Sequence, residues 1–327
     1  MGQLSLFPGH AAKRASEARA ELEARHRALA GVAAGLPPGL RLGTSSWSFP
    51  GWRGIVYAET EGTALLAREG LREYARHPLL RTVGIDRGFY AEIPEADLRS
   101  YASQLPEGFL CCTKAPAAVT SPVLSGSGGE RNPDFLSAER LRREMLGPFA
   151  RAFAAHAGPF VLQFPPLPPE LRRDPARFVD LLDGFFEALP RGPAYAVELR
   201  DRELLCEGYA RVLARHGAAH VYNYWSAMPR PGVQAERLPP AAAPFVVVRL
   251  LLRPGTGYAK RRERFDPFDR IVDPDPGMRS DVTALALEAH RLAIPAFILV
   301  NNKAEGSAPL TIEEIAREIA AARQQSA

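Results

Sequence analysis

Eight short apolar segments, separated by stretches that can form helices, restrict the fold of this chain more than any other feature of its sequence. The segments are rich in Val, Leu, Ile and Phe and recur from Arg41 to near the end of the chain. Near-continuous apolar runs of this length are typical of parallel strands that are buried on both faces. They occupy residues 41–47, 81–90, 109–116, 159–166, 194–201, 219–225, 244–252 and 296–303.

Segments between these runs, such as 135–156, 175–189, 203–216 and 281–293, have the period of amphipathic helices. Eight strand–helix units within roughly 285 residues match the usual size of a (β/α)8 barrel. An open, doubly wound sheet is the alternative, but no glycine-rich phosphate-binding sequence follows the first segment. The sequence therefore predicts an α/β protein: a (β/α)8 TIM-type barrel over residues 39–327 with an N-terminal helical extension.

The predicted extension covers residues 10–38. Residues 10–34 are rich in Ala, Glu and Arg, with Leu22 and Leu29 as sparse apolar positions, and Gly35 and two prolines follow. This composition favours a helix that ends near Gly35. Its thin apolar stripe indicates either a spacer or an outer clasp on the barrel.

Composition sets the broad class. Of the 327 residues, 46% are hydrophobic and 24% charged, which is ordinary for a globular protein. No apolar run approaches the roughly 20 residues that span a bilayer, and no basic stretch leads into a signal-like apolar run. Three cysteines, two of them adjacent (Cys111 and Cys112), cannot form a disulfide framework. We expect a cytoplasmic monomer without membrane contact, whose net charge of +4 permits a polyanionic partner.

The barrel prediction also fixes where a site should lie, because active sites of such barrels lie at the carboxyl ends of the strands. Every predicted strand ends in polar or aromatic side chains, which we interpret as one functional pocket. The candidate substrate-binding residues are Ser45, Trp47, Tyr90, Gln163, Arg200, Asn223, Trp225, Arg249, Asn301 and Asn302.

Three residues are candidates for catalysis: Glu198, Lys114 and Asp86. Glu198 and Arg200 lie two apart, so both side chains point to the same side of a strand. Glu198 would then be a general acid or base oriented by Arg200, or the two would form a structural ion pair. Lys114 would bind an anion or, if desolvated, act as a nucleophile.

The sequence gives little support for a metal site. The seven histidines stand in predicted helices, turns, the N-terminal region or at a strand start. Only Asp86, Glu198 and Asp201 remain as carboxylates near strand ends, too few for a metal-dependent barrel. We therefore expect neither a metal nor another cofactor.

Two loops add candidate features. Residues 125–133, rich in Gly and Ser, are predicted to form a flexible lid. Residues 255–268 combine aromatic side chains with a basic patch, which suits a phosphate backbone with stackable bases. The alternative is a solvated charge run paired with Glu263, Asp266 and Asp269. The patch consists of Lys260, Arg261, Arg262 and Arg264.

Several motifs resemble the YecE-like family, also called domain of unknown function 72. They are GTSSWSFPGW (43–52), FY (89–90), TKAP (113–116), QFPP (163–166), VELR (197–200), VR (248–249) and VNNKAEGSAP (300–309). The resemblance runs from about residue 40 to the end and implies a TIM-type barrel without implying a reaction.

The sequence departs from the family at positions that could carry chemistry. Gly84 and Asp86 stand where the family pattern has Glu and Asn, and Asp201 and Leu204 follow VELR where the family tends to His and Trp. After Arg249, LLRPG replaces His-Gly. These departures keep a non-catalytic protein among the hypotheses.

The first nine residues form a separate feature. The pentapeptide Gln3, Leu4, Ser5, Leu6 and Phe7 resembles the peptide by which bacterial replication and repair proteins dock on the DNA polymerase sliding clamp. In such a motif Gln3 would supply an orienting amide while Leu6 and Phe7 fill an apolar pocket. The alternative is that these residues pack on the barrel itself.

The leading hypothesis is a protein of DNA metabolism or repair that acts on a phosphate-bearing nucleic acid, DNA or RNA, and docks on the clamp. As an enzyme it would be a metal-independent hydrolase or lyase. The alternatives are an enzyme acting on a sugar or sugar phosphate, and a non-catalytic nucleic-acid-binding barrel.

Overall fold

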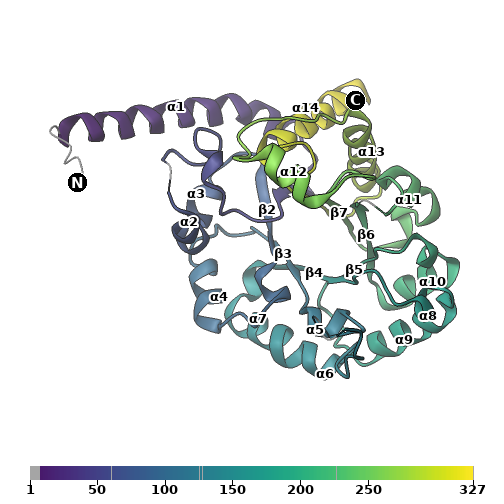
Figure 1. The fold of residues 1–327 in the computed structure, drawn as a ribbon. Helices are drawn as coiled ribbons and strands as arrows, with labels where there is room; N and C mark the ends of the chain where they lie inside the picture. Colours follow the sequence, from purple (N-terminus) through teal and green to yellow (C-terminus); the bar gives the residue numbers. More distant parts are fainter. Residues whose placement is uncertain (1–7, 60, 125, 127, 226, 327) are drawn as a thin grey trace.

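Eight parallel strands close into a barrel in the order of the sequence, β1 to β8 (Figure 1). This computed structural model describes residues 8–59, 61–124, 126, 128–225 and 227–326, so the clamp-like pentapeptide Gln3 to Phe7 lies outside the described residues. The (β/α)8 prediction is confirmed. The strands are β1 Leu40–Thr44, β2 Leu80–Ile85, β3 Cys111–Lys114, β4 Ala157–Gln163, β5 Tyr195–Glu198, β6 Ala219–Tyr224, β7 Val246–Leu250 and β8 Ala296–Val300.

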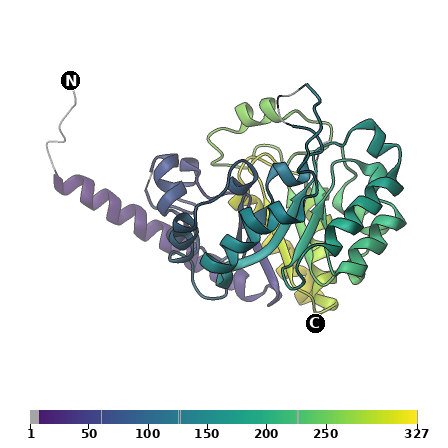
Figure 2. The same cartoon turned by 90° about the horizontal axis from the view of Figure 1, so that it is seen from below.

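Helices surround the barrel, and Figures 1 and 2 show them as an outer layer. The α-helices are α1 Pro8–Ala34, α2 Thr63–Glu69, α3 Leu71–Tyr74, α4 Glu95–Ala102, α5 Ala117–Thr120, α6 Ala138–Leu141, α7 Gly147–Ala152, α8 Pro169–Arg172, α9 Pro175–Glu187, α10 Glu207–His216, α11 Pro231–Arg237, α12 Tyr258–Phe265, α13 Pro276–Arg291 and α14 Ala308–Ser326. Short 3-10 turns occupy Pro50–Trp52, Arg87–Phe89, Ala154–His156, Arg202–Leu204 and Pro240–Ala242. The predicted helix over 135–156 is interrupted, because a π-helical turn at Arg142–Leu146 joins α6 to α7. Among the described residues, no helix has the length and apolar character needed to cross a membrane.

Side chains alternate between two hydrophobic cores, and this alternation aims the site residues. One core fills the barrel and includes Cys112, Ala196 and Val247, whereas the other lies between strands and helices and includes Cys111 and Val197. Because side chains alternate along a strand, the residue two positions after an inward one also points inward. Lys114, Glu198 and Arg249 follow those three inward residues, so all three point into the barrel at its carboxyl end.

Helix α1 packs on the barrel through its second half. Leu22 and Leu29 are buried, Arg25 forms an ion pair with Glu313 on α14, and His26 Nε2 lies 3.2 Å from the Ile55 carbonyl oxygen. Between residues 13 and 21 no residue is buried. Figures 1 and 2 show the first turns of α1 projecting beyond the barrel. The second half therefore clasps the barrel while the first half extends away from it.

Candidate functional site

A buried carboxylate between two arginines forms the centre of the site. Glu198, the last residue of β5, is fully buried. Its Oε1 lies 2.5 Å from Nη2 of Arg200, and its Oε2 accepts a 2.5 Å hydrogen bond from Nη1 of Arg249. Arg249 in turn donates from Nη2 to both carboxylate oxygens of Asp86, at 3.2 and 3.3 Å. We call Asp86, Lys114, Glu198, Arg200 and Arg249 the mouth cluster.

The charges of the cluster keep Glu198 ionised. Burial by itself raises the pKa of this carboxyl group, but the charges of Arg200, Arg249 and Lys114 together outweigh burial and hold the pKa below its usual value. Burial likewise lowers the pKa of Arg249, and Glu198 and Asp86 more than reverse that effect. A carboxylate that stays charged can accept a proton transiently but is a poor general acid at neutral pH.

Arg200 has a buried hydrogen-bond donor without a partner among the described residues. Its guanidinium carbon lies 4.2 Å from the ring centroid of Trp225, and its Nη2 donates to Gln163 Oε1 at 3.1 Å. Its Nη1 is buried and has no hydrogen-bond partner in the part of the chain that the structure describes. Burial lowers the pKa of Arg200 to about 10, which leaves it protonated at neutral pH. An unpaired buried donor of this kind costs free energy unless a ligand or water satisfies it.

Lys114 is the most unusual member of the cluster. Only 6% of its surface is exposed, and its Nζ lies 3.6 Å from the ring centroid of Phe89. No hydrogen bond or ion pair joins this Nζ to any residue within the described ranges. Burial lowers the pKa of Lys114 to about 8, with Asp86 opposing the shift and Arg249 adding to it.

Other predicted residues also meet at this end of the barrel. Asn223 donates from Nδ2 to the Leu199 carbonyl oxygen at 2.8 Å, and its Oδ1 is buried without a partner among the described residues, as is Ser45 Oγ. Asn301 accepts from Lys303 Nζ at 3.2 Å. Asn223 and Asn301 follow the inward residues Val221 and Leu299 by two positions, so both point inward at the same end of the barrel as the mouth cluster.

Tyrosines and a lysine lie at the rim of the mouth. Tyr90 is 81% exposed, and Tyr258 on α12 is also exposed. Burial, Asp86 and then Tyr258 raise the pKa of Tyr90, and Lys114 Nζ lies 5.9 Å from its ring centroid. Lys303, which the sequence reasoning missed, has its Nζ 4.3 Å from the ring centroid of Tyr258. Its position in the VNNKAEGSAP motif, directly after Asn301 and Asn302, was the available signal.

Two predicted pocket residues lie elsewhere. Trp47 donates from Nε1 to the Leu66 carbonyl oxygen at 2.9 Å and packs edge-to-face on Tyr101. Asn302 Oδ1 accepts from Trp52 Nε1 at 3.2 Å and from the Ala308 amide at 2.8 Å. Both side chains serve the helix layer, which corrects the prediction that they line the pocket.

The basic patch is helical and smaller than predicted. Residues 258–265 form α12, in which Arg261 is buried, pairs with Asp273 and donates to the carbonyl oxygens of Lys303 and Ala304. This corrects the inclusion of Arg261, because it is buried and its Nη1 and Nη2 bind groups of the protein itself. Lys260, Arg262 and Arg264 are exposed. Within the described chain, none of these three forms an ion pair with Glu263, Asp266 or Asp269.

The predicted lid is partly anchored. Asn132 is buried and donates to the carbonyl oxygens of Ala118 and Ser121 at 2.6 and 2.7 Å. Residues 125 and 127 lie outside the described residues, so a lid role for 125–133 stays a prediction.

No group of three or more His, Cys, Asp or Glu side chains within the described ranges could hold a metal ion.

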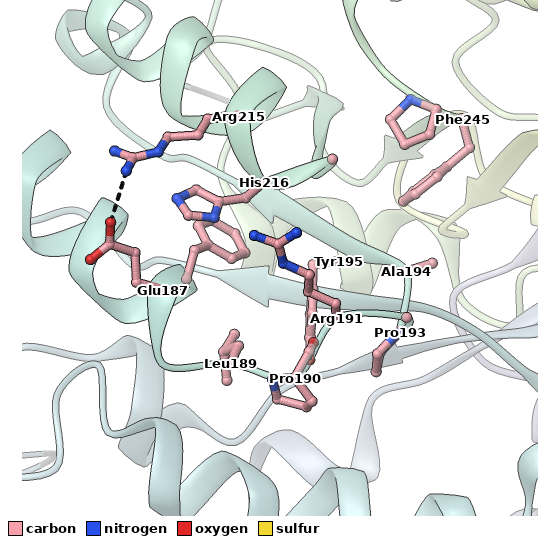
Figure 3. Close-up of a pocket in the computed structure, with 14 residues that line it drawn as sticks. Glu187, Leu189, Pro190, Arg191, Pro193, Ala194, Tyr195, Arg215, His216 and Phe245 are labelled. Carbon is pink, nitrogen blue, oxygen red and sulfur yellow. Dashed lines mark hydrogen bonds and ion pairs between the residues drawn. The ribbon is translucent and has the colours of Figure 1, made fainter.

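A cavity of about 510 Å³ lies at the opposite end of the barrel (Figure 3). Its lining includes residues that precede β5, β6 and β7, among them Arg191, His216 and Phe245. Arg215 donates to Asp183 at 2.7 Å and to Glu187 at 3.0 Å. His216 bonds Asp183 at 2.6 Å and stacks on Phe186. The cavity is thus separate from the mouth cluster.

A closed parallel barrel with a charged cluster at its carboxyl end defines a TIM-barrel protein. More narrowly, the family described as "Protein of unknown function DUF72" matches residues 41–327, and the chain belongs to that family. This confirms the family resemblance read from the motifs.

Solved structures agree on the fold. A DUF72 family protein from Enterococcus faecalis V583 has a TM-score of 0.60 and 17% identity over 86% of this chain and 95% of its own. A DUF72 family protein from Thermotoga maritima MSB8 has a TM-score of 0.58 and 19% identity over 84% of this chain and 97% of its own. No curated protein matches the sequence.

Proposed function

We propose that the mouth of the barrel binds a phosphate-bearing ligand and that the protein acts on nucleic acid in DNA metabolism. The observation that carries this proposal is the buried Nη1 of Arg200, which has no hydrogen-bond partner within the described part of the chain. A phosphate oxygen is a suitable acceptor for it, since charge-assisted hydrogen bonds from arginine to phosphate are among the strongest that side chains make.

The net charge of the cluster favours an anion. Lys114, Arg200 and Arg249 supply three positive charges against the two carboxylates of Asp86 and Glu198, which leaves one positive charge in excess. In this proposal Glu198 orients the arginines and does not itself transfer protons. The low local dielectric strengthens the attraction for an entering anion.

Aromatic and basic side chains at the rim favour a nucleic acid over a bare phosphate. Tyr90 and Tyr258 are exposed at the rim, and Trp225 already stacks on Arg200. Aromatic faces can stack on bases, while Lys260, Arg262 and Arg264 on the adjoining α12 can neutralise backbone phosphates.

Binding of a single-stranded oligonucleotide to the wild-type protein, titrated at several salt concentrations, tests this function. We expect binding that weakens steeply with salt. If a sugar phosphate raises the melting temperature and no oligonucleotide does, the alternative of a small-molecule enzyme replaces the proposal. Binding of neither would reject both.

Docking on the sliding clamp is the second part of the proposal, supported by the sequence of Gln3 to Phe7 and by the exposed first half of α1. At about 1.5 Å per residue, a helix from Pro8 to Leu22 spans roughly 20 Å, which would hold a terminal peptide away from the barrel.

Full-length protein with both Gln3→Ala and Phe7→Ala, compared with wild type in binding to the purified clamp, tests docking. We expect the double variant to lose binding, because the anchor side chain and the orienting amide are gone. Ser16→Ala, an exposed position on α1, is the matched control. Equal affinity of wild type and double variant for the clamp would reject docking through Gln3 to Phe7.

A further inference from the structure

Lys114 combines three properties that a lysine in a simple ion-pair network does not have. It is buried, its Nζ has no ion pair or hydrogen bond within the described part of the chain, and this nitrogen lies over the Phe89 ring. Arg200 and Arg249, by contrast, are bound to Glu198. The position of Lys114 therefore favours a role that uses its nitrogen directly.

The chain uses lysine sparingly. Of its 41 basic residues only four are lysines, namely Lys13, Lys114, Lys260 and Lys303. All the other basic residues counted here are arginines, whose side chains stay protonated and cannot act as nucleophiles. A lysine amine can lose its proton when it is desolvated, and it can then attack a carbonyl group.

We propose that Lys114 forms an imine with an aldehyde that carries a phosphate group, the phosphate being held by Arg200. This inference rests on the proposed function, since it uses the same phosphate site and adds the reactive group of the ligand.

The reaction needs no co-reactant. The lone pair of the neutral Lys114 amine attacks the carbonyl carbon, a C–N bond forms, and the carbonyl oxygen takes up a proton. The C–O bond of this adduct then breaks, and the oxygen leaves as water with the two hydrogens of the amine. The product is a C=N bond between Lys114 and the former aldehyde carbon.

The surroundings of Lys114 suit both forms of the nitrogen. Its desolvated position favours the neutral amine that attacks, and its pKa of about 8 leaves a useful fraction neutral near physiological pH. The Phe89 ring, 3.6 Å away, and the charge of Asp86 stabilise the protonated imine once it forms.

An aldehyde with a phosphate can come from two sources. One is the ring-opened sugar at an abasic site in DNA, which has phosphates on both sides, and the other is a free open-chain sugar phosphate. The chemistry at Lys114 is the same for both, so the experiment carries one arm for each.

Reductive trapping tests the inference. Full-length protein is incubated with an oligonucleotide containing one abasic site, or with glyceraldehyde 3-phosphate, and sodium borohydride reduces any imine to a stable amine. Mass spectrometry of digested protein then locates the adduct. We expect Lys114 to be labelled about tenfold or more faster than exposed Lys260 in at least one arm, since an ordinary lysine is almost fully protonated near pH 8.

Two different replacements of Lys114 and a control variant separate a chemical role of Lys114 from a folding defect. Lys114→Arg keeps the charge and Lys114→Met removes it; both should lose the adduct, whereas Lys13→Arg on α1 should keep it. Peptide mapping on wild-type protein needs no variant at all. Labelling spread evenly over the four lysines, or no labelling in either arm, would overturn the inference. Wild-type protein that binds the ligands but is not labelled would reject the imine and leave the proposed function standing.

Discussion

The two ends of the barrel use charged side chains in opposite ways. At the carboxyl end, Glu198 forms ion pairs with both Arg200 and Arg249, and Arg200 keeps a buried donor that no residue in the described ranges accepts from. At the amino end, the cavity of about 510 Å³ is bordered by Arg215, which is 60% exposed at its side chain and has two carboxylate partners on α9. The cavity provides empty space, whereas the mouth cluster contains a charged side chain, Arg200, whose buried Nη1 has no partner among the described residues. A site for an anion is therefore better identified by unused buried donors than by empty space.

Strand geometry explains why the charges gather at one end. All eight strands are parallel, so their last residues meet at the same rim. Alternation then aims Lys114, Glu198 and Arg249 inward from different strands. Nothing in the geometry forces polar residues to the amino end, where Ala196, Phe245 and Phe297 form the apolar core.

The largest expected effect comes from removing the shared carboxylate. Glu198→Gln leaves two buried arginines and Lys114 without their central anion, and breaking such a buried pair costs about 3 to 5 kcal/mol. Urea unfolding should show a loss in the free energy of unfolding of that size. Glu187→Gln, which removes a 56% exposed partner of Arg215, should cost less than about 1 kcal/mol. Equal losses in the free energy of unfolding for Glu198→Gln and Glu187→Gln would show that the two ends do not differ in how they use charge.

The next effect concerns binding. Arg200→Gln should weaken binding of the phosphate-bearing ligand by about 10- to 100-fold, the usual cost of losing a hydrogen bond to a charged group. Arg191→Gln, in the cavity at the other end, should leave the affinity unchanged. Isothermal titration calorimetry on both variants decides between the two ends, and a larger loss in Arg191→Gln would favour the cavity.

A pH effect is expected from Lys114. Its pKa of about 8 in the folded protein lies below the value of roughly 10.4 for an unfolded lysine. Between these values the unfolded chain holds a proton that the folded chain lacks, so the free energy of unfolding rises with pH across this window, by about 3 kcal/mol.

The difference between wild type and Lys114→Met, followed from pH 7 to 11 by chemical unfolding, isolates this contribution because other titrating groups cancel. Lys13→Arg should match wild type throughout. A constant difference across the window would mean that Lys114 titrates as an ordinary surface lysine.

The smallest effect concerns α12. If Lys260 and Arg262 contact backbone phosphates, changing either to Gln should lower the slope of log affinity against log salt by about 1. Arg211→Gln, an exposed residue on α10 that pairs with Glu207, is the control. An unchanged slope in the α12 variants would confine the ligand to the mouth itself.

Sequence periodicity predicted the barrel and the direction of its main site residues, because both follow from alternation along short strands. Alternation also explains the errors. The Asn301 amide donates to the Leu250 carbonyl oxygen and so continues the strand ladder, which means that only one of the adjacent Asn301 and Asn302 could face inward. Trp47 follows the end of β1 at Thr44, where alternation no longer applies.

Tertiary contacts decided what the sequence could not. The sequence predicts a loop over residues 255–268; as the helix α12 over 258–265, this segment places Arg261 and Phe265 on one buried face, four residues apart. The pairing of Arg249 with both Glu198 and Asp86 joins residues that are 51 and 163 positions apart in sequence. No local pattern encodes such a contact.

A crystal structure of the protein with a bound phosphate-bearing nucleotide would show whether the mouth cluster holds the phosphate. We predict that a phosphate oxygen lies within hydrogen-bond distance of Arg200 Nη1, at the carboxyl ends of the strands. A nucleotide seated instead in the cavity beside Arg191, with the mouth cluster unchanged, would contradict it.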